Sequence, residues 1–438
     1  MKNEYLKKNF FNCALSALII NIVPLTCAAQ GASSVPYRAS GVQTVEFRHE
    51  TAQDRTQTTV PGCVICHLNQ PETLLLSFDV LNGNTESLYY SLIHCNVDWQ
   101  PSDLMEMEYI DGFNRTYDSD KYSLSFNTTT AFVHYEMTIE TSRILASGNY
   151  MLEIRQTSDD ALLVREPLWM TEDACGIATR VDKGESSQDV ELAVRWPNHG
   201  ISSPESQLKI FVWQNKRIDD MRQADSPTFV RPDEIVYEHQ DILRFCGGRE
   251  WRWLDTRSIR LIGISDSRVE YVTNMYHYTM APDQTARAYS YCEDFNGGSW
   301  IESRDRRDGD VEEVADYAMT HYTFVAEDPT LLDKSEVYIL GDATGWMPSS
   351  ANRLTPDAST LSFHGQHIVK QGIHNYLYVC RTKGSDAAPQ MTETEGCYGE
   401  TENDYYVAVY TRLPGETYDH LVAVKRHNTL KSRNEFLM

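Results

Sequence analysis

Apolar and polar residues alternate with a period of two along much of this chain, which is the pattern of β-strands with one buried face. The clearest alternation runs over residues 131–140, with Ala131, Val133, Tyr135, Met137 and Ile139 on one face and Phe132, His134, Glu136, Thr138 and Glu140 on the other. Further strands are expected at 74–78, 150–155, 190–194, 208–213, 259–264, 337–340, 366–369, 376–379 and 405–410, with a turn at Gly148 and Asn149. No amphipathic pattern suits a helix longer than about two turns. The pattern therefore predicts an all-β chain of tandem β-sandwich domains.

The length of the chain indicates more than one domain. It has 438 residues, and at about 150 residues per domain this suggests two or three globular units. We expect a signal peptide at 1–29, a flexible lead-in at 30–42, a first β-sandwich at 43–171, a second β-domain at 172–316 and a C-terminal domain at 317–438.

The N-terminus has the features of an export signal. Lys7 and Lys8 form a basic start, an apolar stretch covers residues 10–25, and small residues lead to Ala29. We expect cleavage after Ala29. Lipid attachment at Cys27 is the alternative, but Pro24 stands where a lipoprotein signal carries an aliphatic residue. No other apolar run reaches the ~18 residues that a membrane-spanning helix needs, so the mature protein is predicted to be exported without inserting into a membrane.

Charge narrows the range of partners. The chain carries 63 acidic and 39 basic residues, a formal charge of −24. The leader holds three lysines and one glutamate, a net +2, so its removal leaves −26. A protein this acidic is repelled by phosphate, which disfavours nucleic acid and anionic lipid surfaces as partners.

Cysteines suggest two kinds of chemistry. Eight cysteines remain after cleavage, and in an oxidising compartment they can form disulfides, although about 105 connectivities are possible. Cys380 and Cys397 flank a polar loop and form one candidate pair. Cys63, Cys66 and His67 have the C-x-x-C-H spacing of c-type haem attachment. Val64 and Ile65 favour a strand, in which the two thiols point to opposite faces, so two buried strand residues are the favoured interpretation and haem or a redox dithiol are alternatives.

Other catalytic and metal motifs are missing from the sequence. It contains no H-E-x-x-H, no paired C-x-x-C, no EF-hand loop, no glycine-rich phosphate loop and no G-x-S-x-G elbow. His364 and His367 are expected on opposite faces of a strand, and the acidic group at 305–310 is expected to be a solvated loop. We therefore predict a protein that is not an enzyme and has no cofactor or metal.

The densest motif spans residues 89–114, which read YYSLIHCNVDWQPSDLMEMEYIDGFN. This segment resembles the first domain of the type IX secretion system plug protein family. Segments that fit the same family precede this motif at 76–79 and follow it in order at 147–150, 245–258, 276–277, 395–405 and 418–419. Cys63 and Cys66 depart from the family pattern, which has ordinary apolar strand residues there.

The resemblance implies a periplasmic protein with no reaction of its own. Its partner would be the large outer-membrane β-barrel translocon of the type IX secretion system. The chain would close the periplasmic mouth of that pore when no substrate shuttle is bound, through a moderate polar interface that releases readily.

Two groups of residues are the candidate sites. His94, Asn96, Asp98 and Trp99 either form a loop that meets the translocon or hold an irregular turn of the fold. Residues 337–346 and 372–376 resemble an early-set, immunoglobulin-like domain of the glycogen-binding kind, in which Trp346 and Tyr376 would stack on sugar rings. A tryptophan that closes a turn over the core is the other interpretation of Trp346. The alternative function is therefore a periplasmic or surface polysaccharide-binding protein, and a c-type cytochrome is a second rival.

Overall fold

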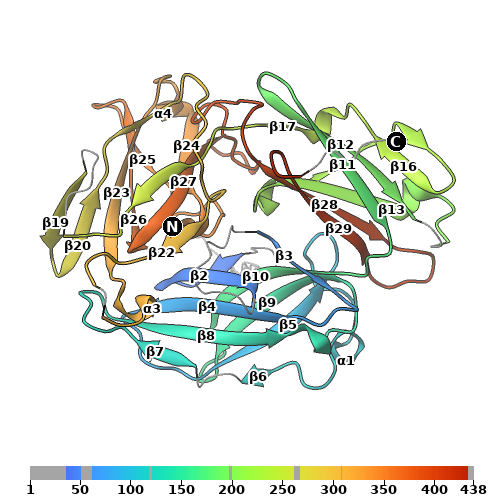
Figure 1. Ribbon diagram of the computed structural model, residues 1–438, viewed down its shortest axis with the longest axis horizontal. Helices are drawn as coiled ribbons and strands as arrows, with labels where there is room; N and C mark the ends of the chain where they lie inside the picture. The colour runs from blue at the N-terminus through green and yellow to red at the C-terminus, as the bar shows by residue number, and fades with distance from the viewer. Residues whose placement is uncertain are drawn as a thin grey trace, which may run out of the picture. The chain divides into compact units, whose positions relative to one another are not determined.

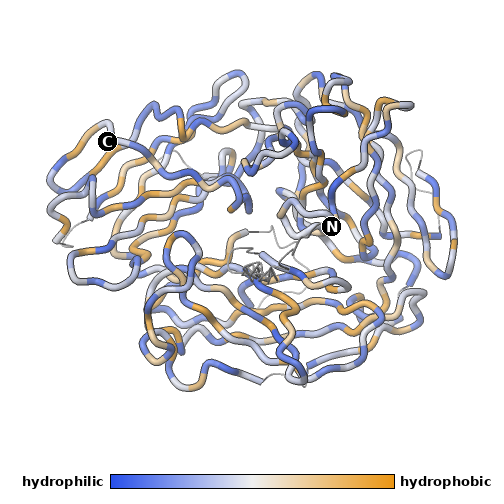
Figure 2. The backbone as a smooth tube through the Cα atoms, turned by 180° about the vertical axis from the view of Figure 1, so that it is seen from behind, coloured by the Kyte–Doolittle hydropathy of each residue, from blue (hydrophilic) through white to orange (hydrophobic). Residues whose placement is uncertain are grey.

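β-strands dominate the structure, as the alternating pattern predicts. The computed structural model describes residues 36–50, 62–117, 121–196, 200–260, 267–306 and 308–432. Within these residues the strands pair into six sheets, and the buried apolar residues between sheets form the cores of three β-sandwiches (Figure 1). Orange and blue segments alternate along the strands in Figure 2, as expected for elements with one face in a core. The predicted all-β sandwich fold is confirmed.

The first sandwich contains most of the N-terminal part of the described chain. One sheet holds β1 (Tyr37–Arg38), β10 (Leu162–Thr171), β9 (Gly148–Gln156), β5 (Leu88–Cys95), β6 (Thr116–Tyr117) and β3 (Val64–His67). The other holds β2 (Val42–His49), β4 (Thr73–Leu81), β8 (Phe132–Glu140) and β7 (Tyr122–Leu124). Leu74, Leu76 and Phe78 of β4 alternate into the core that Leu152 and Ile154 of β9 enter from the other sheet. Burial stabilises the fold by about 1.5–3 kcal/mol for each such side chain.

The middle sandwich is built from two distant parts of the chain. One sheet holds β11 (Gly176–Lys183), β12 (Ser187–Arg195), β16 (Glu234–Tyr237), β15 (Phe229–Val230) and β17 (Arg244–Cys246). The other holds β14 (Arg222–Gln223), β13 (Leu208–Gln214), β28 (Asp404–Thr411) and β29 (His420–Asn428). Figure 1 shows the red strands β28 and β29 beside the green β13. The last hairpin of the described chain therefore completes a sheet that begins near residue 208.

The third sandwich is inserted between β17 and β28 of the middle one. One sheet holds β18 (Arg252–Asp255), β27 (Gly372–Thr382), β22 (Ser299–Ile301) and β24 (Ser335–Leu340). The other holds β19 (Arg268–Val272), β20 (Met275–Thr279), β23 (Tyr317–Val325), β26 (Ser362–Lys370), β25 (Thr355–Asp357) and β21 (Asp283–Gln284).

This arrangement differs from the linear boundaries expected from the sequence. The strand expected at 405–410 does form, but it pairs with β13 and β29 in the middle sandwich and not with strands of the third sandwich. β18 to β22, expected in the second domain, pair with strands of the third sandwich. The difference arises because long-range pairing between antiparallel strands leaves no local mark on the sequence.

The helices are single turns, in line with the expected absence of long ones. They are α1 (Glu106–Tyr109), α2 (Pro204–Gln207), α3 (Val311–Val314), α4 (Leu331–Lys334) and the 3₁₀ turns η1 (Thr141–Arg143), η2 (Ile218–Asp220), η3 (Asp241–Leu243) and η4 (Asp342–Thr344). Among the described residues, none of these helices has the length and apolar character to cross a bilayer.

Two local predictions need correction. Gly148 and Asn149 do not form a turn but are the first residues of β9. Part of the expected lead-in, Tyr37–Arg38, pairs with β10 as β1. The predicted signal peptide 1–29 and residues 261–264 of the predicted strand 259–264 lie outside the described residues.

A disulfide joins the two crossings between the middle and third sandwiches. Cys246, at the end of β17, is bonded to Cys397, in the segment that leads back to β28. Cys380 is a free, buried cysteine in β27, so the candidate Cys380–Cys397 pair is wrong. The chain leaves the middle sandwich after residue 246 and returns after residue 397, and the disulfide ties these two points together. In the chain-entropy account, closing a loop this long stabilises the fold by up to about 5 kcal/mol.

Candidate functional sites at the sandwich junctions

His94, the first residue of the candidate loop, is a buried residue at the end of β5. Its Nδ1 lies 2.7 Å from Ser102 Oγ and its Nε2 lies 2.9 Å from the carbonyl oxygen of Ser147. Burial is the main cause that lowers the pKa of His94, so the ring is neutral, donates from Nε2 to Ser147 and accepts at Nδ1 from Ser102. A Cβ on Gly148 would lie 2.5 Å from Nε2. Glycine at position 148 therefore lets the backbone approach the imidazole.

Asn96 links the first sandwich to the hairpin of the middle one. Its Oδ1 accepts hydrogen bonds from Arg412 (2.7 Å) and from the backbone N–H of Asp419 (3.1 Å). Asp419 in turn accepts from the N–H of Val97 (3.3 Å) and forms an ion pair with Lys209 (3.2 Å). Residues 418–419, which are distant from the 94–99 motif in the sequence, thus contact it directly. The hydrogen bonds of Asn96 and Val97 therefore connect the first sandwich to the β28–β29 hairpin of the middle sandwich.

Asp98 and Trp99 shape the turn itself. Asp98 is exposed and its Oδ1 accepts from the N–H of Gln100 at 3.1 Å. Trp99 has a left-handed backbone, with φ of +61°, and its N–H donates to the carbonyl oxygen of Asn96 at 3.0 Å. Its ring meets Trp169 edge-on at 5.1 Å. The four motif residues therefore form a structured turn whose exposed member is Asp98.

Trp99 belongs to an apolar contact between the first and middle sandwiches, which we call the aromatic junction (Trp99, Trp169, Trp213 and Tyr406). Trp169 on β10 stacks on Trp213 of β13 at 5.4 Å, and Trp213 stacks on Tyr406 of β28 at 5.4 Å. Trp213 and Tyr406 are a cross-strand pair. Trp169, Trp213 and Tyr406 are fully buried. Each such aromatic pair adds about 0.5–1.5 kcal/mol to the stabilisation from buried area.

Cys63 and Cys66 lie on opposite sides of β3, as the strand interpretation predicts. Cys63 packs in the aromatic junction, where its sulfur accepts from Trp213 Nε1 at 3.3 Å. Cys66 packs in the core of the first sandwich. Thioether attachment to one haem needs both thiols on the same side, and this geometry does not offer it.

A second contact, between the first and third sandwiches, is polar, and we call it the charged junction (Asp79, His134, Tyr317 and Lys370). Asp79 and His134 are a cross-strand pair of β4 and β8, and Tyr317 and Lys370 are a cross-strand pair of β23 and β26. The Asp79 carboxylate accepts from Lys370 Nζ (2.6 Å), His134 Nδ1 (2.6 Å) and the Tyr317 hydroxyl (2.5 Å). The side chains of Lys370 and Asp79 are 1% and 0% exposed.

The burial of these groups and the charges beside them shift the pKa values of three residues at or near the charged junction. Burial alone raises the pKa of Asp79, but Lys370 and His134 outweigh it and lower the pKa below its ordinary value. Burial, Asp79 and its hydrogen bond raise the pKa of Tyr317 well above 10. Nearby on β2, burial and then Asp342 raise the pKa of Glu46 to about 7. The junction thus contains a buried ion pair beside a carboxyl group that resists ionisation.

Trp346 and Tyr376, the candidate sugar-stacking residues, lie inside the third sandwich. They are 2% and 4% exposed. Trp346 donates to Asp342 Oδ1 at 3.2 Å and meets Trp251 edge-on at 5.1 Å, and the Tyr376 hydroxyl donates to Asp283 at 2.7 Å. Neither ring offers a free face to solvent, so these residues are core residues in the described structure and the polysaccharide-binding alternative loses its candidate site.

A group of exposed apolar residues follows the 94–99 motif, and we call it the apolar tip (Met105, Met107 and Phe113). Their exposed fractions are 63%, 76% and 89%. They lie on α1 and its flanking loops, where the exposed Glu106, Glu108 and Asp111 stand between them in sequence. The Arg143 side chain donates to the carbonyl oxygens of Asp111 and Phe113 and fixes the end of this loop. These residues are not among the candidates predicted from the sequence, although apolar and acidic residues alternate visibly within the 89–114 motif.

Comparison with known proteins connects the first sandwich to a family. Residues 42–172 match the model of the family described as "Type 9 secretion system plug protein 1st domain". A search of curated proteins finds no match. The chain is similar in fold to the crystal structure of a hypothetical protein from Parabacteroides merdae ATCC 43184, with a TM-score of 0.81 and 24% sequence identity over 90% of this chain and 99% of that chain.

Proposed function

We propose, from the premise that residues 42–172 belong to the type 9 secretion system plug first-domain family, that this chain is a non-enzymatic plug of that secretion system. Membership of that family implies a location in the periplasm or cell envelope. In the proposal the chain sits in the periplasm against the outer-membrane β-barrel translocon and closes its mouth when no substrate shuttle is bound. The family match is the observation that carries the proposal.

The junctions support this role because a plug has to resist deformation. Three sandwiches joined only by flexible linkers would move relative to one another and would not keep a fixed shape over a wide pore. Here the aromatic junction fixes the first sandwich to the middle one, and the charged junction fixes the first to the third. The Cys246–Cys397 disulfide ties the base of the inserted sandwich. These contacts favour one rigid body that binds by its shape.

The apolar tip is the surface that we propose for docking. Exposed side chains as large as Met107 and Phe113 are costly to leave in water and mark contact surfaces when they cluster. The intervening carboxylates of Glu106, Glu108 and Asp111 call for a partner surface with an apolar patch and a basic rim. Such a rim would also bind a chain with a formal charge of −24, which anionic lipid would repel.

A pull-down tests this proposal. The mature chain, immobilised and mixed with detergent-solubilised outer membranes from a strain that lacks the shuttle subunit, is expected to recover the giant barrel protein. Met107→Asp and Phe113→Asp are expected to lower recovery by about tenfold or more, since each places a charge in the apolar contact. Phe229→Asp is the matched control, because Phe229 is an exposed aromatic residue of the middle sandwich.

Two results would count against the proposal. Failure to recover any barrel protein would remove the plug function itself. Equal losses from the tip variants and the Phe229 control would remove only the assigned surface. Salt gives a further check, because docking by a basic rim must weaken as ionic strength rises.

A further inference from the structure

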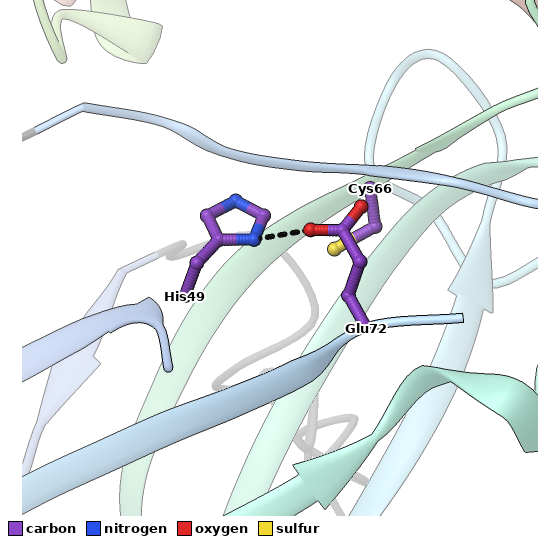
Figure 3. A group of neighbouring side chains, drawn as sticks. All are labelled: His49, Cys66 and Glu72. Carbon is purple, nitrogen blue, oxygen red and sulfur yellow. Dashed lines mark ion pairs between the residues drawn. The ribbon is translucent and has the colours of Figure 1, made fainter. Parts of the chain in front are cut away.

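Three potential metal ligands meet at one edge of the first sandwich. His49 is the last residue of β2, Cys66 lies in β3, and Glu72 directly precedes β4. Figure 3 shows their side chains directed toward one another, with the ion pair between His49 and Glu72 drawn as a dashed line. The imidazole nitrogen, the sulfur and a carboxylate oxygen all lie within 4.8 Å of one another.

The donor set is the one that zinc favours. Zinc accepts imidazole nitrogen, thiolate sulfur and carboxylate oxygen, and sites with three protein ligands keep a fourth position for water. A harder cation such as calcium or magnesium would take only oxygen ligands, and thiolate and imidazole exclude it on chemical grounds. The mixed set of nitrogen, sulfur and oxygen therefore indicates a borderline transition metal.

Burial distinguishes this group from an ordinary surface ion pair. Cys66 is 0% exposed and free, and its sulfur makes no hydrogen bond among the described residues. The side chains of His49 and Glu72 are 36% and 29% exposed, so the group is open to solvent on their side. The buried Cys66 thiol thus lies beside two side chains that are about one third exposed, and a cation can reach the three ligands from their solvent side.

We propose that His49, Cys66 and Glu72 bind one zinc ion, with water as the fourth ligand. The His49 Nδ1 and Glu72 Oε2 atoms lie 2.6 Å apart. Tetrahedral coordination at bond lengths of about 2.0 Å separates two such ligands by about 3.3 Å, so the cation takes the place of this direct contact. Binding forms a zinc–sulfur bond and releases the thiol proton to solvent.

The ligands' positions give the metal a structural role. β3 pairs with β10 in one sheet, whereas β2 and β4 pair in the other. One zinc ion would therefore connect the two sheets of the first sandwich at an edge. Binding at this edge stabilises the folded state in proportion to zinc concentration above the dissociation constant.

This group could not be predicted from the sequence because its spacing matches no metal motif. The three ligands are 17 and 6 residues apart in the sequence and come from three separate elements. The nearby Cys63 and His67, which complete the haem-like motif, lie outside it. Cys63 packs in the aromatic junction and His67 pairs with Asp173.

Zinc binding by the intact mature chain, purified without an affinity tag and stripped with a chelator, tests the proposal. After zinc chloride is added back to the stripped protein and unbound zinc is removed, we expect one zinc per chain by mass spectrometry. The thermal unfolding temperature is expected to be higher than that of the stripped protein. His49→Asn and Glu72→Gln alter half-exposed side chains and are expected to weaken zinc binding on the order of tenfold or more while the protein stays folded. His67→Asn is the matched control and is expected to bind like the wild type.

Cobalt identifies the sulfur ligand. Cobalt(II) in the site is expected to give a near-ultraviolet sulfur-to-metal charge-transfer band that Cys66→Ala abolishes and Cys63→Ala retains. A wild-type protein that binds clearly less than one zinc per chain after zinc is added overturns the proposal. So does tight binding that His49→Asn and Glu72→Gln leave unchanged, which would place the ion elsewhere.

Discussion

The aromatic junction and the charged junction solve the same problem with opposite chemistry. Each is built from cross-strand pairs on the outer faces of sandwich sheets. Trp213 pairs with Tyr406 in one, and Lys370 pairs with Tyr317 in the other. The aromatic junction gains from buried apolar area and ring stacking, in small increments. The charged junction depends on complete compensation of buried charge, so the loss of one partner costs more than the pair contributes.

Because the two junctions differ in chemistry, substitutions in them are expected to lower the free energy of unfolding in different ways. An apolar contact tolerates a smaller side chain at a cost that scales with the lost volume. A buried ion pair tolerates loss of both partners better than loss of one. The two junctions should therefore respond differently to single and double substitutions.

The largest expected effect comes from the charged junction. Lys370→Met leaves the Asp79 carboxylate buried without its cation and is expected to lower the free energy of unfolding by about 3–5 kcal/mol. Urea unfolding followed by tryptophan fluorescence measures this change. The double variant Lys370→Met with Asp79→Asn is expected to recover more than half of the loss. A double variant as unstable as the single one would contradict the account of compensated charge.

At the aromatic junction we expect a smaller and additive effect. Trp213→Leu removes the stack between Trp169 and Tyr406 and is expected to lower the free energy of unfolding by about 2–3 kcal/mol. Adding Tyr406→Leu should lower the stability further, with no recovery. Recovery in that double variant would show that the junction does not act through apolar packing.

The link from Asn96 to the hairpin is expected to contribute less. Asn96→Ala removes the acceptor for Arg412 and for the N–H of Asp419 and is expected to cost about 1–2 kcal/mol. Amide hydrogen exchange in β29 should rise, because its start loses this anchor. The matched control is Asp98→Ala, since Asp98 is exposed and bonds only within its own turn. Equal effects of the two substitutions would refute the role given to Asn96.

The smallest expected effect depends on pH. The pKa of Glu46 is raised to about 7 in the folded protein, so the folded state holds a proton that the unfolded state loses above about 4.5. The stability contributed by Glu46 is thus present at low pH and is lost as pH rises through 7. Glu46→Gln is expected to stabilise the protein by about 1 kcal/mol at pH 8 and to have little effect at pH 4.5. The same gain at both values would contradict the assigned pKa.

The local pattern predicted the strands well because burial of alternate residues sets their position. The strands expected at 74–78 and 208–213 lie within β4 and β13, and the strand expected at 131–140 matches β8 except for its first residue. The outer face of β8 carries Phe132 and His134, which are buried because the third sandwich covers them. A period of two shows that a strand has two faces and does not show what covers the second one.

Long-range pairing explains what the sequence did not predict. β13 and β28 pair although about 190 residues separate them in the sequence, and the residues of neither strand indicate which strand it pairs with. The same insertion brings Cys246 beside Cys397, whereas Cys380 and Cys397 are closer in sequence. The candidate motif 94–99 was recognisable as a unit, but its contacts with Arg412 and Asp419 depend on the fold.

Electrical conductance of the translocon barrel tests the central proposal most directly. The purified barrel, reconstituted in a planar lipid bilayer without its shuttle subunit, is expected to conduct ions. Adding the mature chain to the periplasmic side should lower the conductance to nearly zero, and Met107→Asp with Phe113→Asp should abolish that block. An open pore that conducts equally with and without a saturating amount of the chain would contradict the plug function.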